Sequence, residues 1–145
     1  RAHCLGRQIN SKRIVEMILF IDTSDFNNLT LALVHGPIVK LHVANVAFNE
    51  NYKTNLMLEK FLKHQKVAPK DLSKIIVCSG PGSFTGIRVG VSLAQALGFA
   101  LHIPVIAISK LKVPEDIRKL STVKGGKSLV MNYGQKPNIT KAKKK

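Results

Sequence analysis

The apolar positions of the chain predict three strands followed by two helix–strand pairs. Ile18–Ile21 is an apolar run that ends at residues 22–24, and Leu29–Val34 is a second run after a short turn. Residues 35–37, His-Gly-Pro, are a turn signal before Ile38–Ala44, where apolar and polar residues alternate as in a strand with one exposed face. These three runs predict an antiparallel meander.

The second part of the pattern alternates helix with strand. Apolar residues recur at helical spacing between residues 51 and 65, and a longer helix is expected over Thr85–Leu101. Ile75–Cys78, between the two helices, is apolar at every position, which is typical of a strand covered on both faces. A further buried strand is expected over Pro104–Ile108.

The predicted order β-β-β-α-β-α-β indicates the α/β class and a single actin-like (ribonuclease H-like, ASKHA) half-domain. Two right-handed crossovers onto a sheet that begins as a meander leave few other topologies. Beyond Ser109 the pattern weakens to a short helix at Val113–Leu120, a turn at residues 125–126 and a short strand at Leu129–Tyr133. We therefore expect the actin-like domain over residues 17–111, with a remnant second lobe and a basic tail over 112–145.

Residues 1–16 show no clean periodicity, and Met17 is followed at once by a strand. We expect Met17 to be the natural start and residues 1–16 to be a non-native or disordered leader. A hydrophobic content of 45% and a mean hydropathy of +0.07 are typical of a folded globule. No apolar run reaches the length of a membrane span, and two cysteines, Cys4 and Cys78, make no disulfide framework. A reducing, cytoplasmic location is expected.

The net charge of +15 lies mostly outside the predicted domain. Residues 17–109 carry a net charge of only +3, whereas residues 110–145 carry +9. The tail that ends at Lys141–Lys145 could contact RNA through its phosphates. The alternative is a solvated tail that only improves solubility.

Ser79–Gly90, reading SGPGSFTGIRVG, connects a strand to a helix through a glycine-rich loop. Backbone N–H groups and the helix dipole converge on such a turn and favour an anion. The candidate anion-binding residues of the loop are Gly80, Gly82, Ser83, Thr85 and Arg88, with Ser83 or Thr85 as the helix N-cap. Because the loop matches neither the Walker nor the dinucleotide fingerprint, a purely structural loop that allows close helix–strand packing is the alternative.

The helix after the loop carries small residues at four-residue intervals. Glycines cost a helix about 1 kcal/mol each relative to Ala, so their repetition indicates close contact with another backbone. That contact is either the domain's own sheet or a helix of a partner. As interface residues we assign Gly86, Gly90, Leu93, Ala94, Leu97, Gly98 and Leu101.

Few groups in the sequence suggest catalysis. Asp22 ends the first strand, where actin-like ATPases hold a metal-associated carboxylate, which makes it a candidate cofactor-binding residue. One carboxylate without a partner cannot support metal-assisted phosphoryl transfer, so capping of backbone N–H groups is the favoured role of Asp22. The five histidines show no metal-ligand spacing, and Cys78, Ser79 and Ser83 have no evident base. We assign no catalytic and no metal-binding residue.

Three segments resemble the TsaB (YeaZ) family. They are MILFIDTS at Met17–Ser24, IIVCSGPGSFTGIRVGVSLAQALGFAL at Ile75–Leu101 and IPVIAISKL at Ile103–Leu111. The resemblance implies a non-catalytic subunit that pairs with the TsaD subunit through a helical interface. With the ATPase TsaE the pair supports transfer of a threonylcarbamoyl group to the adenosine beside the tRNA anticodon. It also implies that ATP and Mg²⁺ are bound by the partners, and that this chain is a short form of the family.

The leading hypothesis is therefore a scaffold that heterodimerises with a TsaD-like subunit, with a homodimer possible in its absence. The alternative is an enzyme that binds a nucleotide or acyl phosphate at the glycine loop as a homodimer. A stand-alone RNA binder that uses the basic tail is a third hypothesis.

Overall fold

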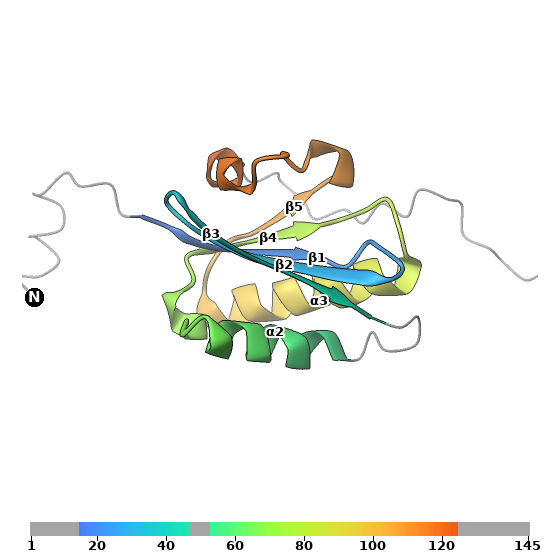
Figure 1. The fold of residues 1–145 in the computed structure, drawn as a ribbon, viewed down its shortest axis with the longest axis horizontal. Coiled ribbons are helices and arrows are strands. Elements are labelled where there is room, and N and C mark those ends of the chain that lie inside the picture. Colours follow the sequence, from blue (N-terminus) through green and yellow to red (C-terminus); the bar gives the residue numbers. More distant parts are fainter. Residues whose placement is uncertain (1–14, 47–52, 125–145) are drawn as a thin grey trace, which may run out of the picture.

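The computed structural model describes residues 15–46 and 53–124, and these form one mixed five-stranded sheet with helices on both sides (Figure 1). The order across the sheet is β3-β2-β1-β4-β5. β1 pairs antiparallel with β2, β2 pairs antiparallel with β3, and β1, β4 and β5 run parallel. The strands are β1 (Met17–Asp22), β2 (Asn28–His35), β3 (Ile38–Asn45), β4 (Lys74–Cys78) and β5 (Val105–Ile108).

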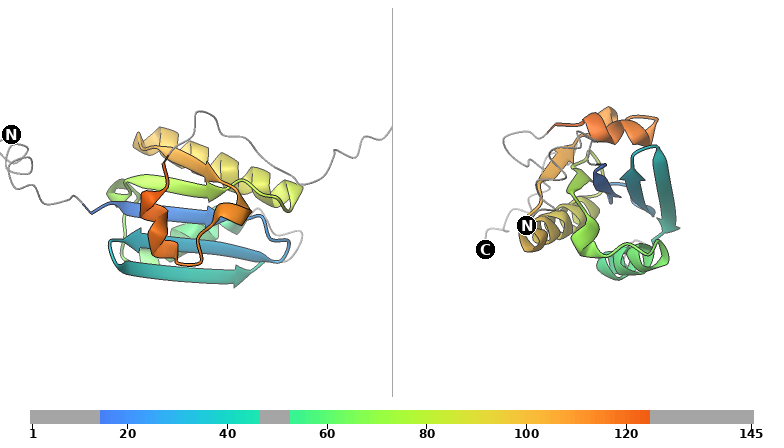
Figure 2. Two further views of the ribbon diagram at one scale, coloured as in Figure 1. Left: turned by 90° about the horizontal axis from the view of Figure 1, so that it is seen from above. Right: turned by 90° about the vertical axis from the view of Figure 1, so that its left-hand side faces the viewer.

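The two α-helices, α2 (Thr54–His64) and α3 (Phe84–Leu101), cover one face of this sheet (Figures 1 and 2). The 3-10 helices η3 (Lys110–Lys112) and η4 (Ile117–Thr122) lie over the opposite face, while η2 (Pro69–Asp71) links α2 to β4. The meander followed by two parallel crossovers confirms the α/β class and the single actin-like half-domain predicted from the sequence.

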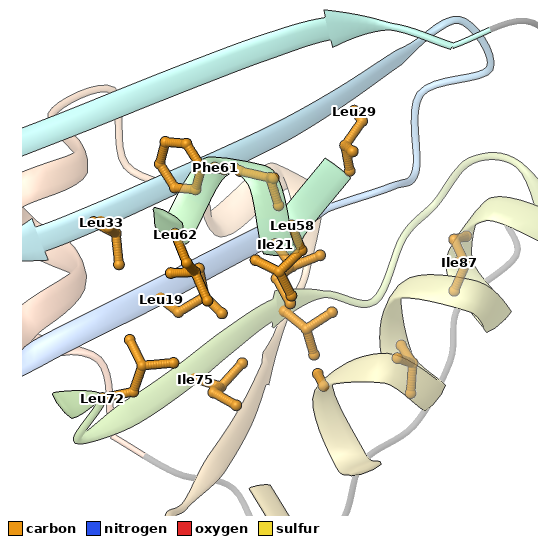
Figure 3. Close-up of a cluster of buried hydrophobic side chains, with 14 of the residues drawn as sticks. Leu19, Ile21, Leu29, Leu33, Leu58, Phe61, Leu62, Leu72, Ile75 and Ile87 are labelled. Carbon is orange, nitrogen blue, oxygen red and sulfur yellow. The ribbon is translucent and has the colours of Figure 1, made fainter. Parts of the chain in front are cut away.

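The larger core lies between the sheet and the helices (Figure 3). Side chains of β1 and β4 point into it between α2 and α3, because alternate strand residues face the same side. Its members include Leu19, Ile21, Leu58, Phe61, Leu62, Ile75 and Ile87. A smaller core on the other face joins Phe20, Ile76 and Cys78 to Leu120 of η4, whose side chain is completely buried.

The C-terminal part of the described chain differs from the prediction. Of the helix expected over Val113–Leu120, only the 3-10 helix η4 from Ile117 is present. Pro114 interrupts the backbone hydrogen bonding, and Asp116 starts a new turn by accepting from the Arg118 N–H at 3.1 Å. Burial of Leu120 means that the packed body continues past Leu111, the boundary expected from the sequence. The turn at 125–126 and the strand at 129–133 lie outside the described residues.

The burial of β3 is the second feature that differs from the prediction. Alternation predicted one buried face, yet six of its eight residues are exposed. Ile38, Leu41 and Val43 keep 54%, 57% and 56% of their surface exposed. β3 is an edge strand in the described part of the sheet, and most of its residues are left uncovered by the described elements on either face.

α3 also has 18 residues with a mean hydropathy of 1.4, so its length and composition alone would suit a membrane span, contrary to the expectation from the sequence. Its buried residues are those that pack on the sheet, including Ile87, Val91 and Ala94. Packing on the sheet therefore accounts for the apolar residues on one face of α3, while 33% of the helix as a whole is buried.

Candidate functional site

The loop after β1 and the glycine loop after β4 meet at the carboxyl edge of the sheet and are locked together. The Ser83 N–H donates to the Ser24 carbonyl at 2.8 Å, and the Thr23 hydroxyl donates to the Gly86 carbonyl. A Cβ at Gly82 would overlap the Ser24 carbonyl oxygen, and one at Gly86 would overlap that of Thr23. These two glycines are required because backbone passes against backbone here.

The predicted anion-binding residues of the glycine loop are largely engaged within the chain. Of the two N-cap candidates, Ser83 and Thr85, it is Ser83 that caps α3, by accepting from the Gly86 N–H at 3.2 Å. The Gly80 carbonyl accepts from the Lys110 N–H at 2.9 Å, which ties η3 to the loop. Thr85 and Arg88 are exposed on the first turn of α3. The loop therefore serves first to join β1, β4 and α3, which favours the structural alternative considered above.

Asp22 lies half-buried at the end of β1, and its contacts are those of a backbone cap. Its Oδ1 accepts from the Ser24 N–H at 2.9 Å and from the Ser24 hydroxyl at 2.6 Å. The Cys78 thiol donates to the Ser24 hydroxyl at 3.6 Å. Burial, and then the negative charge of Asp22, raises the pKa of Cys78 above its usual value. A protonated, buried thiol is not a nucleophile.

The small-residue stripe of α3 faces the protein's own sheet. Gly86, Gly90, Ala94 and Gly98 are all buried. A Cβ at Gly90 would overlap the Thr23 side chain, and one at Gly98 would overlap Val105. The assignment of these four residues to a partner interface is thereby corrected, since a partner cannot reach them while α3 stays packed.

The other three residues assigned to an interface lie along the edge of α3. Leu93, Leu97 and Leu101 are each partly buried against the core. Leu93 and Leu97 line a shallow groove of about 470 Å³ between α3 and α2, whose opposite wall includes Leu58 and Leu62. Glu59 and Lys63, paired at 2.8 Å, stand at the rim of this groove. We call it the α2–α3 groove.

Sequence reasoning treated the five histidines as unrelated. The structure brings His42 and His64 to a second groove on the other flank of α2, with His35 at its continuation. Only the strand register could have revealed this, because Lys40 and His42 pair with β2 residues of the helix-covered face. In the described part of the chain, no group of three or more His, Cys, Asp or Glu residues is arranged to hold a metal ion.

A family model described as TsaD, tRNA N6-adenosine threonylcarbamoyltransferase, matches residues 45–133. The "tRNA threonylcarbamoyladenosine biosynthesis protein TsaB" of Bacillus subtilis is 37% identical over 95 residues, which are 66% of this chain and 42% of that protein. The TsaB protein of Buchnera aphidicola from Schizaphis graminum is 34% identical over 98 residues, which are 68% of this chain and 46% of that protein.

The solved structure of YeaZ from Pseudomonas aeruginosa is similar to this one, with a TM-score of 0.62 and 31% sequence identity. The match covers 68% of this chain and 46% of that protein. The chain thus spans less than half the length of the curated relatives and of the solved structure that it matches.

Proposed function

Because the chain belongs to the TsaB (YeaZ) family, we propose that it takes part in tRNA threonylcarbamoyladenosine biosynthesis as the non-catalytic partner of a TsaD-like subunit. In this proposal the TsaD-like subunit binds ATP and Mg²⁺, a TsaE-like ATPase joins the complex, and all act in the cytoplasm. The basic tail adds a phosphate contact to tRNA.

The observation that carries this proposal is the α2–α3 groove. Leu93 and Leu97 line this groove from α3 and are only partly buried, and Leu58 and Leu62 line it from α2. Partly exposed apolar side chains on adjacent helices are suited to packing against a helix of another chain. The glycine loop, in contrast, uses its Ser83 and Gly86 N–H groups internally, so we do not propose an enzyme acting there.

The proposal is tested with Ala100→Arg on the full chain. Ala100 is exposed on α3, one turn beyond Ala96 and on the same side as Leu93 and Leu97. A bulky charge there blocks close approach of a partner helix without entering the core. In calorimetric titration with the TsaD-like subunit, we expect affinity to fall by about tenfold or more, the scale of an interface hot spot.

Gln95→Arg is the matched control, because Gln95 is exposed on the opposite flank of the same helix and receives the same charge. Its affinity should equal that of the unmodified chain. Equal affinity for all three chains would overturn the α2–α3 groove as the partner surface. Absence of any complex between the unmodified chain and a TsaD-like subunit would overturn the proposed function itself.

A further inference from the structure

A second hollow, of about 640 Å³, lies between β3 and the flank of α2 opposite the α2–α3 groove. Met57, Lys60, Phe61 and His64 line it from the helix, and His42 lines it from the strand. It adjoins a smaller hollow of about 160 Å³, because Gln65 lines both. His35 and Lys40 line the smaller one. We call the two together the β3 groove.

The floor of the β3 groove is an aromatic stack. The ring of His42 lies over that of Phe61, with centroids 5.8 Å apart and planes inclined by 22°. Phe61 is buried in the core and holds the stack in place, while His42 is exposed. An exposed, supported aromatic ring can take a further planar ring, and nucleobases stack on His as they do on Phe or Tyr.

The ionisable side chains around this stack are basic, and the remaining polar one is Gln65. Lys60 and His64 come from α2, and His35 and Lys40 come from the end of β2 and from β3. No residue that lines either hollow in the described chain is acidic. A stacking platform beside a line of basic groups is the combination that binds single-stranded nucleic acid without sequence preference.

We propose that the β3 groove binds single-stranded RNA, with a base stacked on His42 and backbone phosphates held by Lys60, His64 and Lys40. The choice of RNA among phosphorylated planar ligands rests on the proposed function. The site is compatible with that function, because α2 separates it from the α2–α3 groove where the partner docks. One helix thus presents a protein surface on one flank and an RNA surface on the other.

The test measures binding of a fluorescein-labelled, unstructured RNA octamer to the full chain by fluorescence anisotropy at several salt concentrations. His42→Ala removes the platform, and we expect the Kd to rise about tenfold or more, whereas His42→Phe keeps the ring and stays within about threefold. Lys60→Ala removes one phosphate contact and should lower the slope of log affinity against log salt by about 0.7.

Lys119→Ala is the charge-matched control, because Lys119 is exposed on η4 across the sheet. If Lys60→Ala and Lys119→Ala change the Kd equally, RNA is held by general positive charge and the proposal is overturned. The proposal is also overturned if His42→Ala leaves the Kd unchanged. AMP at millimolar concentration should compete poorly; full competition would indicate a mononucleotide site instead. The RNA measurement uses the chain without a TsaD-like subunit, whereas complex formation is measured separately. Loss of the RNA proposal would therefore leave the proposed partner binding untouched.

Discussion

Gly86 is a residue whose missing side chain decides the packing of the site. In an exposed helix, replacing glycine by alanine stabilises by up to about 1 kcal/mol. Here the added methyl group overlaps the Thr23 carbonyl, which cannot move without disturbing β1. We expect Gly86→Ala to lower the free energy of unfolding by about 1–3 kcal/mol, measured by urea denaturation.

Ser92→Ala provides the reference for that measurement, because Ser92 is exposed on the same helix. The change improves helix propensity and should alter stability by less than about 0.5 kcal/mol. A Gly86→Ala variant as stable as Ser92→Ala would show that α3 does not press on the loop after β1.

Cys78 makes the free energy of unfolding depend on pH in the alkaline range. Burial, and then the charge of Asp22, raises the pKa of Cys78 above its ordinary value in the folded state. The folded state therefore holds the thiol proton more tightly than the unfolded state does. Its contribution is complete below pH 9 and is lost as the pH rises through the folded pKa.

The comparison that isolates this effect is with Cys78→Ala. Between about pH 8 and 11 the unmodified chain should lose more of its unfolding free energy than the variant loses, because other titrating groups are common to both. Parallel pH profiles for the two chains would contradict the raised pKa.

At the scale of elements, the sequence predicted the strands and both α-helices because their apolar runs are long and bounded by clear turns. The sequence could not predict which surface the small-residue stripe of α3 packs against. Small residues at four-residue spacing look the same whether they face a partner or a sheet. Thr23, which fills the space beside Gly90, is far away along the chain, and Val105, beside Gly98, belongs to the next strand, β5.

The β3 groove is a second feature that the sequence alone could not predict. His42 and Phe61 come from a strand and a helix joined by residues 46–53, and neither alone carries a binding signal. Their stacking depends on register and on how α2 crosses the sheet. The prediction of Ser83 or Thr85 as N-cap, in contrast, needed only their position at the start of the helix, and the structure shows that Ser83 is the cap.

For the molecule as a whole, the folded half-domain places its candidate surfaces on α2 and α3, on one side of the sheet (Figure 2). The other side is covered by the two short 3-10 helices η3 and η4. The edge strand β3 remains largely exposed. The fold is that of the family, while the two candidate surfaces are defined by the side chains that line the hollows on either flank of α2.

The exposed edge at β3 has a consequence for the colloidal behaviour of the protein. An edge strand with exposed Ile38, Leu41 and Val43 is a template for pairing with the same strand of another molecule. Lys40 stands among these residues, and a lysine on an edge opposes such pairing through charge repulsion and desolvation.

Lys40→Thr should therefore accelerate aggregation of concentrated solutions on mild heating, followed by static light scattering. Lys119→Thr, with the same loss of charge on the opposite side of the sheet, should not. Equal scattering from the two variants would show that resistance to aggregation depends on net charge alone. With the predicted difference, a single lysine on β3, an edge strand of the described sheet, keeps this chain dispersed at high concentration.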